Sequence, residues 1–151
     1  MRTTNNTLTF IDLFAGLGGF HIALESLGCK CVFTSELKED LQKLYKINFP
    51  DNPRIEGDIT KVDLTSIPHH DILCAGFPCQ PFIQAGKRQG FDDDYKGLCR
   101  GTLFMDVARI CDEHNPDVIF CENVKGLAIH DKGRTFEIIR KTFEDLGYKV
   151  F

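Results

Sequence analysis

The stretch FIDLFAGLGGF, residues 10–20, joins an apolar segment to a glycine-rich turn and then to a second apolar pattern. Apolar residues dominate Leu8 to Phe14, which predicts a buried strand. Beyond the turn, apolar residues recur at i, i+3, i+4 and i+7, the spacing of one helix face. This face consists of Phe20, Ala23, Leu24 and Leu27, and Gly28 marks its end. The stretch therefore predicts a strand, a tight turn and a helix.

The same alternation of apolar runs and helix-period segments continues along the chain. Further strands are predicted at Cys31–Thr34, Ile72–Ala75 and Val118–Cys121, with another beginning at Tyr148–Phe151. Further helices are predicted around Leu37–Tyr45, Leu103–Glu113 and Phe136–Leu146. Continuous apolar strands separated by amphipathic helices are typical of an α/β fold with a doubly wound, mostly parallel sheet. Because the chain ends where a strand begins, we expect this fold to be incomplete at its C-terminus.

The composition is that of one globular domain. The 151 residues are 42% hydrophobic and 26% charged, and no apolar stretch approaches the length of a membrane span. A net charge of -4 argues against a uniformly basic protein that wraps nucleic acid, although it is compatible with a local basic loop. The seven cysteines include no CxxC pair, so no metal site is predicted. Without a secretory signal, we expect free thiols in a reducing cytoplasm.

The glycine-rich turn and a carboxylate 20 residues after Gly16 indicate a nucleotide-type site. Glu36 follows the second predicted strand, where a carboxylate accepts hydrogen bonds from both hydroxyls of a ribose. His21 replaces the third glycine of the dinucleotide-binding pattern, which favours a cofactor without a pyrophosphate. Close packing of strand on helix is the alternative explanation of the glycines. Asp58 could accept a hydrogen bond from an adenine amino group, or it could cap a helix or form an Asx turn.

Two further motifs follow the third and fourth predicted strands. The sequence GFPCQPF, residues 76–82, places Cys79 between two prolines that restrict the loop backbone, which favours a nucleophilic thiolate over a structural thiol. Glu122, in the sequence ENV, ends an apolar strand at the same expected edge of the sheet. It could simply face solvent. Alternatively, its carboxyl is partly desolvated, has a raised pKa and donates a proton to a ring nitrogen.

Together these motifs carry a family resemblance. FIDLFAGLGGF, SE, GDIT, GFPCQPF and ENV, in this order, resemble the C5-cytosine DNA methyltransferases, and the similarity to the bacterial restriction-modification type extends over the whole chain. The resemblance implies the fold of S-adenosylmethionine-dependent methyltransferases and transfer of a methyl group to carbon 5 of a cytosine flipped out of duplex DNA. Cys79 would add to carbon 6 of that cytosine, and Glu122 would hydrogen-bond its Watson–Crick edge and stabilise N3.

The resemblance also assigns binding roles. Glu36 would bind the ribose of S-adenosylmethionine, Asp58 and Ile59 the adenine edge, and the glycine loop the methionine part. The cofactor-binding positions are Phe14, Ala15, Gly16, Leu17, Gly18, Gly19, Glu36, Leu37, Asp58, Ile59, Pro78 and Leu103. The substrate-binding positions are Phe77, Gln80, Lys87, Arg88, Asn123 and Val124, of which Lys87 and Arg88 fit phosphate contacts in a loop that closes over DNA.

The sequence also departs from the family. Leu37 stands where many relatives place a larger side chain against the adenine, which predicts weaker stacking. The family's later arginine-containing motif, its target-recognition domain and its final helix are not found in the 151 residues. We therefore expect residues 1–151 to be the N-terminal part of the catalytic domain, either truncated or complemented by a second polypeptide, in a bacterial cytoplasm. The same chemistry on a transfer RNA cytosine, or a non-catalytic module that binds a cofactor or partner, is the alternative.

Overall fold

A computed structural model describes residues 7–52, 54–78 and 103–151 of the chain. The chain forms two compact units. The sheet unit consists of Met1–Gly76 together with His114–Glu122, and the helical unit consists of Phe77–Glu113 together with Asn123–Phe151.

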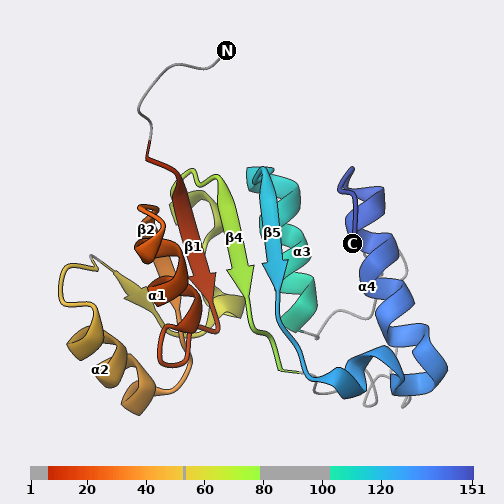
Figure 1. Ribbon diagram of the computed structural model, residues 1–151, viewed down its shortest axis with the longest axis horizontal. Coiled ribbons are helices and arrows are strands. Elements are labelled where there is room, and N and C mark those ends of the chain that lie inside the picture. Colours follow the sequence, from red (N-terminus) through yellow and green to blue (C-terminus); the bar gives the residue numbers. More distant parts are fainter. Residues whose placement is uncertain (1–6, 53, 79–102) are drawn as a thin grey trace. The chain divides into compact units, whose positions relative to one another are not determined.

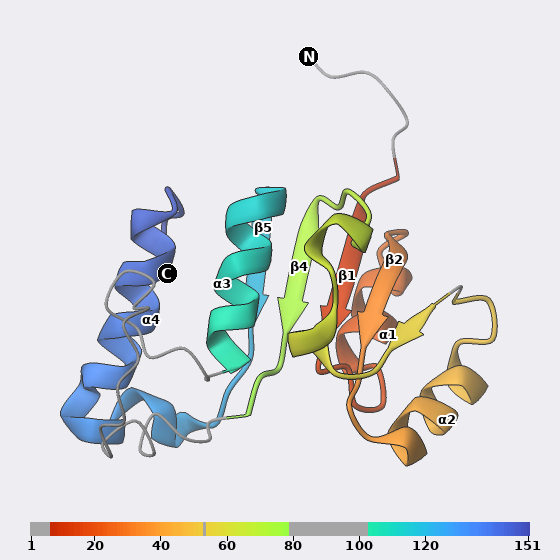
Figure 2. The same ribbon diagram turned by 180° about the vertical axis from the view of Figure 1, so that it is seen from behind.

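The sheet unit contains five strands in the order β3-β2-β1-β4-β5 (Figure 1), and Figure 2 shows the same order from behind. The strands are β1 (Thr9–Leu13), β2 (Lys30–Ser35), β3 (Ile55–Glu56), β4 (Ile72–Ala75) and β5 (Val118–Cys121). Every neighbouring pair is parallel. The predicted α/β class and parallel sheet are therefore confirmed, whereas β3 was not predicted because two residues carry no periodic pattern.

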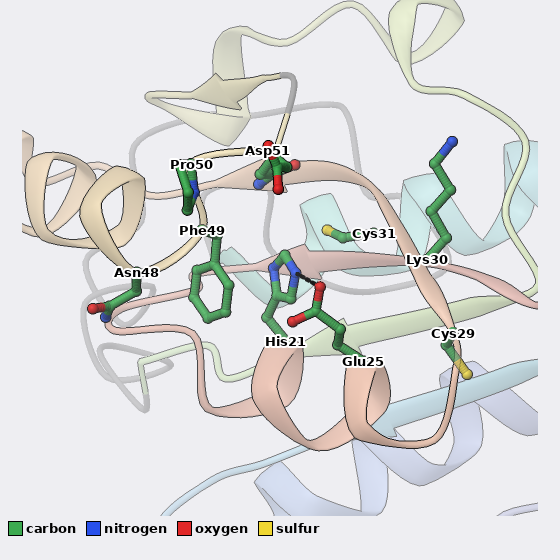
Figure 3. Close-up of a pocket in the computed structure, with 10 residues that line it drawn as sticks. His21, Glu25, Cys29, Lys30, Cys31, Asn48, Phe49, Pro50 and Asp51 are labelled. Carbon is green, nitrogen blue, oxygen red and sulfur yellow. Dashed lines mark ion pairs between the residues drawn. The ribbon is translucent and has the colours of Figure 1, made fainter.

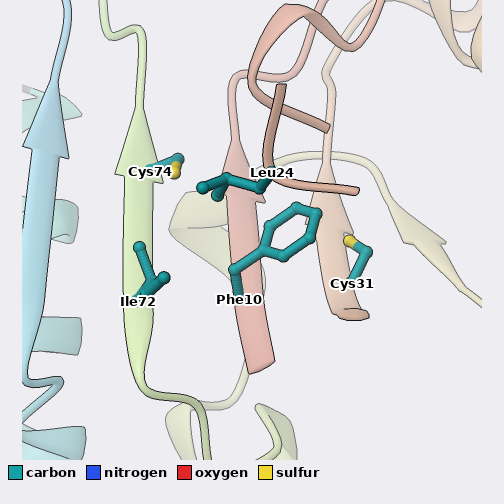
Figure 4. Close-up of a cluster of buried hydrophobic side chains, with 5 residues drawn as sticks. All are labelled: Phe10, Leu24, Cys31, Ile72 and Cys74. Atoms are coloured by element: carbon teal, nitrogen blue, oxygen red, sulfur yellow. The ribbon is translucent and has the colours of Figure 1, made fainter. Parts of the chain in front are cut away.

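Helix α1 (Gly19–Ser26) buries His21 and Leu24. The predicted apolar face is only partly confirmed, because Leu24 is buried and Phe20 half-buried, whereas Ala23 and Leu27 are exposed. Leu24 from this helix meets Phe10 of β1, and the cluster is completed by Cys31, Ile72 and Cys74 from the neighbouring strands (Figure 4). Burying an aliphatic or aromatic side chain of this size stabilises a fold by about 1.5–3 kcal/mol. The helix ends where Gly28 adopts a left-handed φ of 82° and donates its N–H to the Glu25 carbonyl at 2.9 Å.

Helix α2 (Glu39–Asn48) follows β2. Glu39 and Asp40 lie in its first turn, where their negative charges interact favourably with the positive end of the helix dipole. Tyr45 is its one fully buried side chain. The helix ends at Phe49, directly before Pro50, which cannot continue it. Two short 3-10 turns, η1 (Ile59–Lys61) and η2 (Leu64–Ser66), connect β3 to β4.

The helical unit contains α4 (Arg134–Asp145), most of α3 (Leu103–His114) and the 3-10 turns η4 (Lys125–Ala128) and η5 (His130–Gly133). Its core includes a run of aromatic contacts. The Phe104 ring lies 5.6 Å from the Phe77 ring and 5.5 Å from the Phe143 ring, measured between centroids. On the exposed face of α4, Arg140 pairs with Glu137 and Glu144, as oppositely charged residues three and four positions apart do on a helix.

The prediction that a strand begins at Tyr148–Phe151 is wrong. These residues have no strand assignment. Tyr148 instead donates its N–H to the Phe143 carbonyl at 2.9 Å, and its ring lies edge-on to the Phe143 ring. A strand requires a neighbouring strand for its backbone hydrogen bonds, whereas Tyr148 is bound back to the end of α4.

Candidate functional site at the carboxyl edge of the sheet

The parallel strands of the sheet unit all end at one edge, and the predicted site residues follow these ends (Figure 1). The glycine loop follows β1 and Glu36 follows β2. Gly76 follows β4 and Glu122 follows β5. In sheets of this kind, ligands bind beyond the carboxyl ends of the strands. The fold therefore brings together the carboxylates and glycines that the sequence singled out.

The glycine loop, residues 14–19, turns sharply through left-handed backbone. Phe14, Gly16 and Gly18 have φ values of 59°, 56° and 88°. Among the described residues, no heavy atom lies within 4 Å of the place where a side chain would begin at Gly16, so this glycine leaves an open cradle. At Gly18 the same position is filled by the Phe49 ring. The two glycines are thus favoured for different reasons. At Gly16 the reason is the left-handed φ alone, and at Gly18 it is the left-handed φ together with close packing against Phe49.

Glu36 ties the glycine loop to the end of β2. Its two carboxylate oxygens accept the N–H groups of Gly16 and Lys38, each at 2.9 Å. Its own N–H donates to the Glu56 carbonyl at 2.9 Å, and Gln42 donates to its carbonyl at 2.6 Å. The side chain is 8% exposed, so a buried carboxylate is held in one orientation by backbone donors. Each oxygen retains a lone pair with which it can accept a hydroxyl.

Exposed apolar side chains flank this carboxylate. Leu17 in the glycine loop is 55% exposed and Leu37, directly after Glu36, is 66% exposed. Ala15 donates its N–H to the Ser35 carbonyl at 3.0 Å, which fixes the start of the loop against β2. Gly19 is the first residue of α1, so the loop leads into the positive end of a helix. An apolar rim around a fixed carboxylate suits a ligand with an aromatic base next to a sugar.

Asp58 acts as a helix cap in the structure. Its carboxylate accepts the N–H of Thr60 at 3.1 Å and the hydroxyl of Thr60 at 2.7 Å, and Lys61 lies 3.4 Å away. The hydroxyl bond, followed by the backbone bond, lowers the pKa of Asp58. The capping alternative is therefore confirmed, and any bond to an adenine would use the remaining lone pairs. Ile59 is 5% exposed, so its side chain belongs to the core.

The residues present fit a nucleoside cofactor without a pyrophosphate. Gly16 leaves open space at the loop, and the buried Glu36 carboxylate beside it is acceptor-only, as a ribose diol requires. Pairing of β3 with the end of β2 brings the segment of Asp58 to the same edge, because Ser35 is in register with Glu56.

On the other half of the edge, the ends of β4 and β5 adjoin. Glu122 donates its N–H to the Ala75 carbonyl at 3.0 Å, and one of its carboxylate oxygens lies 3.7 Å from the place where a side chain would begin at Gly76. Gly76 donates its N–H to the Leu13 carbonyl at 3.3 Å, which ties this corner to the end of β1. Glu122 is exposed, so the expected desolvation of its carboxyl is absent from this structure.

Asn123 and Phe77 form a second link between these two segments, within the helical unit. The Asn123 amide donates to the Phe77 carbonyl at 2.7 Å, and its oxygen accepts the N–H of Val124 at 2.9 Å. Phe77 is 3% exposed and packs on Phe104. Pro78 and Val124 are exposed, and Leu103 is half-buried at the start of α3. Four predicted positions, Cys79, Gln80, Lys87 and Arg88, lie outside the described residues.

Asp12, a buried residue of β1 two positions before the glycine loop, was not predicted from the sequence. It is 1% exposed, and neither of its carboxylate oxygens has a hydrogen-bond partner among the described residues. Burial raises its pKa from 3.8 to about 7, which the nearby His21 N–H opposes and the charge of Glu36 reinforces. A lone Asp among apolar strand residues is the signal that could have found it.

The sheet unit also contains a pocket of about 390 Å³ between α1, the start of β2 and residues 48–52 (Figure 3). The stacked rings of His21 and Phe49 form part of its wall.

In the part of the chain that the structure describes, no three His, Cys, Asp or Glu side chains group as a metal site. Within the same residues, no helix is long and apolar enough to cross a membrane.

Comparison of folds gives the class of protein. The structure matches a solved mutant of the Spodoptera frugiperda DNMT2 with a TM-score of 0.65 and 26% sequence identity, over 90% of this chain and 41% of that one. The parallel sheet is accordingly that of an α/β protein with a methyltransferase fold.

Sequence comparison then gives the family. The family of C-5 cytosine-specific DNA methylases matches residues 8–151, and the chain belongs to this family. It is 54% identical to the type II methyltransferase M.HhaI of Haemophilus parahaemolyticus over 93% of this chain and 41% of that protein. It is 57% identical to M.HpaII of Haemophilus parainfluenzae over 94% of this chain and 38% of that protein. The chain thus spans about two fifths of the length of these relatives, and the resemblance seen in the sequence is confirmed.

Proposed function

We propose that this chain is the cofactor-binding and nucleophile-bearing part of a DNA cytosine-5 methyltransferase of a restriction-modification system. The observation that carries the proposal is the convergence of the glycine loop, Glu36, Gly76 and Glu122 at one edge of the sheet, in a chain that belongs to this family over residues 8–151. Residues 1–151 would act as one catalytic domain.

The cofactor would be S-adenosylmethionine, whose sulfonium supplies an electrophilic methyl group when it is bound. Glu36 would accept hydrogen bonds from the ribose hydroxyls with the lone pairs that Gly16 and Lys38 leave free. The exposed Leu17 and Leu37 would cover apolar faces of the ligand, and Asp58 would accept from the adenine amino group while it caps η1. The methionine part would lie along residues 14–19, with Pro78 and Leu103 as further contacts.

Cys79 would be the nucleophile. Carbon 5 of cytosine is a weak nucleophile, so the Cys79 thiolate forms a bond to carbon 6 and the electrons of the 5,6 double bond become available at carbon 5. Carbon 5 would then accept the methyl group as its bond to the sulfonium breaks and leaves a neutral thioether. Loss of the carbon 5 proton to solvent or a base would return electrons to the 5,6 double bond and release the Cys79 thiolate from carbon 6. Glu122 would hydrogen-bond N3 as charge develops there. Its place beside Gly76, three residues before Cys79, supports this role.

Duplex DNA would be the substrate. Lys87 and Arg88 would contact phosphates, and Phe77, Gln80, Asn123 and Val124 would surround the flipped cytosine. For Asn123 we propose an indirect contribution, because its amide is already used to link the Phe77 carbonyl to the Val124 N–H. The segment before Cys79 and the segment after Glu122 would therefore move as one piece.

The proposal is tested by transfer of labelled methyl from S-adenosylmethionine to duplex DNA, by the chain alone and with extract of its source organism, which supplies any further polypeptide that transfer needs. Cys79→Ser should lower transfer by about 10³-fold or more, on the scale of a lost nucleophile, and leave cofactor affinity within a few-fold. The control is Cys29→Ser, a half-buried free cysteine away from this edge.

A second readout tests the covalent step. Duplex DNA with 5-fluorocytosine at the target base should form an adduct that survives denaturation, because fluorine at carbon 5 cannot leave as a proton does. An assembly that methylates ordinary DNA, forms no such adduct and tolerates Cys79→Ser would rule out the proposed mechanism.

A further inference from the structure

Gly18, the second glycine of the loop, packs against a cluster of aromatic rings that was not predicted from the sequence. The cluster consists of His21 in α1, Tyr45 in α2 and Phe49 at the end of α2. The rings of His21 and Phe49 are stacked, with centroids 3.8 Å apart and planes 11° from parallel (Figure 3). The Tyr45 ring lies 4.6 Å from that of Phe49.

The polar atoms of this cluster are paired with one another. His21 Nδ1 and the Tyr45 hydroxyl are 2.5 Å apart, and the same hydroxyl lies 3.1 Å from the Thr34 hydroxyl in β2. Tyr45 is fully buried and Phe49 is 8% exposed. Burial lowers the pKa of His21, which favours the neutral imidazole. In that form Nδ1 can accept a hydrogen bond from the Tyr45 hydroxyl. Helix α2 is thereby fixed to both α1 and β2.

The Phe49 ring packs against Gly18 so closely that it leaves no room for a side chain there. A Cβ at Gly18 would overlap the Phe49 ring, coming within 2.7 Å of Cζ, and would stand 3.0 Å from the Tyr45 ring. From the other side, Glu36 holds the Gly16 N–H at 2.9 Å. The loop is therefore clamped at two points, by a carboxylate at Gly16 and by an aromatic ring at Gly18.

We infer that Phe49 is a positioning residue for the cofactor site, acting through Gly18 on the shape of the glycine loop. The inference rests on the proposed function, since it assigns to Phe49 the preorganisation of that site. A loop that is already in its bound shape loses less conformational freedom on binding, so its ligand binds more tightly. Among the described residues, the ring pairs of Phe49 are with His21 and Tyr45, and the Glu36 carboxylate is bonded to the N–H groups of Gly16 and Lys38.

Two substitutions at Phe49 test the inference in opposite ways. Phe49→Leu removes the ring that supports Gly18. Phe49→Tyr keeps the ring and its stack on His21 but adds a hydroxyl at Cζ, which is bonded to Cε2, the ring atom nearest to the Cβ position of Gly18. The matched control is Phe33→Leu, which makes the same change at a buried position of β2 in the same unit.

Affinity for S-adenosylmethionine is measured by calorimetric titration of the 151-residue chain, at a temperature where every variant is folded by circular dichroism. Both Phe49 variants should bind about tenfold more weakly, the effect of roughly one ordered loop contact, and Phe33→Leu should bind like the wild type. Amide exchange at Gly16 and Gly18 should be faster in Phe49→Leu than in Phe33→Leu.

The outcomes separate the two proposals. If the wild type binds the cofactor and both Phe49 variants bind as well as Phe33→Leu does, the role of Phe49 is overturned and the proposed function stands. Equal losses in Phe49→Leu and Phe33→Leu would also overturn it, because they would reflect general loosening of the unit. If the wild type does not bind the cofactor, the proposed function fails and the inference fails with it.

Discussion

Folding shifts the pKa of an aspartate in opposite directions at the two edges of the sheet. At the amino edge, the Asp71 carboxylate accepts the N–H of Thr9 at 2.7 Å and its hydroxyl at 2.9 Å, and these bonds lower its pKa. Toward the carboxyl edge, Asp12 is buried without a partner among the described residues, and its pKa is raised to about 7. The same residue type is a paired anion at one edge and a partly neutral acid at the other.

The difference shows where this sheet is built for stability and where it is not. At the amino edge, Thr9 of β1 is hydrogen-bonded to Asp71, the residue directly before β4. The carboxyl edge combines left-handed backbone at Phe14 with a buried orphan carboxylate at Asp12. Such features cost free energy, and they persist mostly where a site needs them. We therefore expect substitutions at the carboxyl edge to affect ligand binding or to stabilise, and those at the amino edge to destabilise.

The largest expected effect is that of Asp12→Asn on stability against pH. The pKa of Asp12 is higher in the folded chain than the 3.8 of the unfolded one, so folding favours its protonated form. The wild type therefore loses stability from this group as the pH rises from about 4 through 7. An asparagine does not ionise, so the variant should gain up to roughly 4 kcal/mol relative to the wild type by pH 8.

Urea unfolding of both proteins at a series of pH values measures this difference. It should be independent of pH below 4, grow between pH 4 and 7, and level off above. Titrating groups that do not interact with Asp12 contribute equally to both proteins, so their contributions cancel. A difference that stays constant from pH 4 to 8 would mean that Asp12 has an ordinary pKa and a partner.

The next effect concerns Glu36, at the same edge. Glu36→Ala removes the proposed ribose acceptor and releases the Gly16 N–H, so S-adenosylmethionine should bind more weakly by about 1–3 kcal/mol, the scale of a hydrogen bond to a charged group. Glu39→Ala, an exposed carboxylate three residues further on, is the control for a lost negative charge. Equal affinities for the wild type and Glu36→Ala in calorimetric titration would remove the ribose assignment.

Most of the fold could be predicted from hydrophobic periodicity. Ile72–Ala75 and Val118–Cys121 were predicted with the bounds of β4 and β5, because both are continuous apolar runs between breaking residues. The burial implied by this pattern holds for β4, whereas β5 is mostly exposed in the structure. Hydrophobic periodicity did not predict the last four residues correctly. Tyr148 to Phe151 follows a predicted helix that ends at Gly147, as a next strand would, but a strand depends on a neighbour that local sequence does not specify.

The site was predictable where function depends on residue type and order. Glu36 could be found because its distance from the glycine loop is fixed by one helix and one strand. Phe49 could not, because it reaches Gly18 only through the packing of α2, and nothing near Pro50 marks a contact 31 residues back. Asp12 was missed for a related reason, since burial and the lack of partners are three-dimensional properties.

The smallest effect is expected at the amino edge, from Asp71→Asn. The amide oxygen can still accept from Thr9, but without the charge that strengthens these two bonds, so the chain should lose about 1 kcal/mol of unfolding free energy at pH 7. Because the pKa of Asp71 is lowered by folding, this loss should disappear as the pH falls below 4, the reverse of the Asp12 profile. Affinity for S-adenosylmethionine should not change, since Thr9 and Asp71 lie at the starts of β1 and β4, whereas the described site residues follow the strand ends. A fall in cofactor affinity in Asp71→Asn, at a pH where the variant is folded, would show that the two edges are coupled through β1 and would end the division of the sheet into a stabilising edge and a functional one.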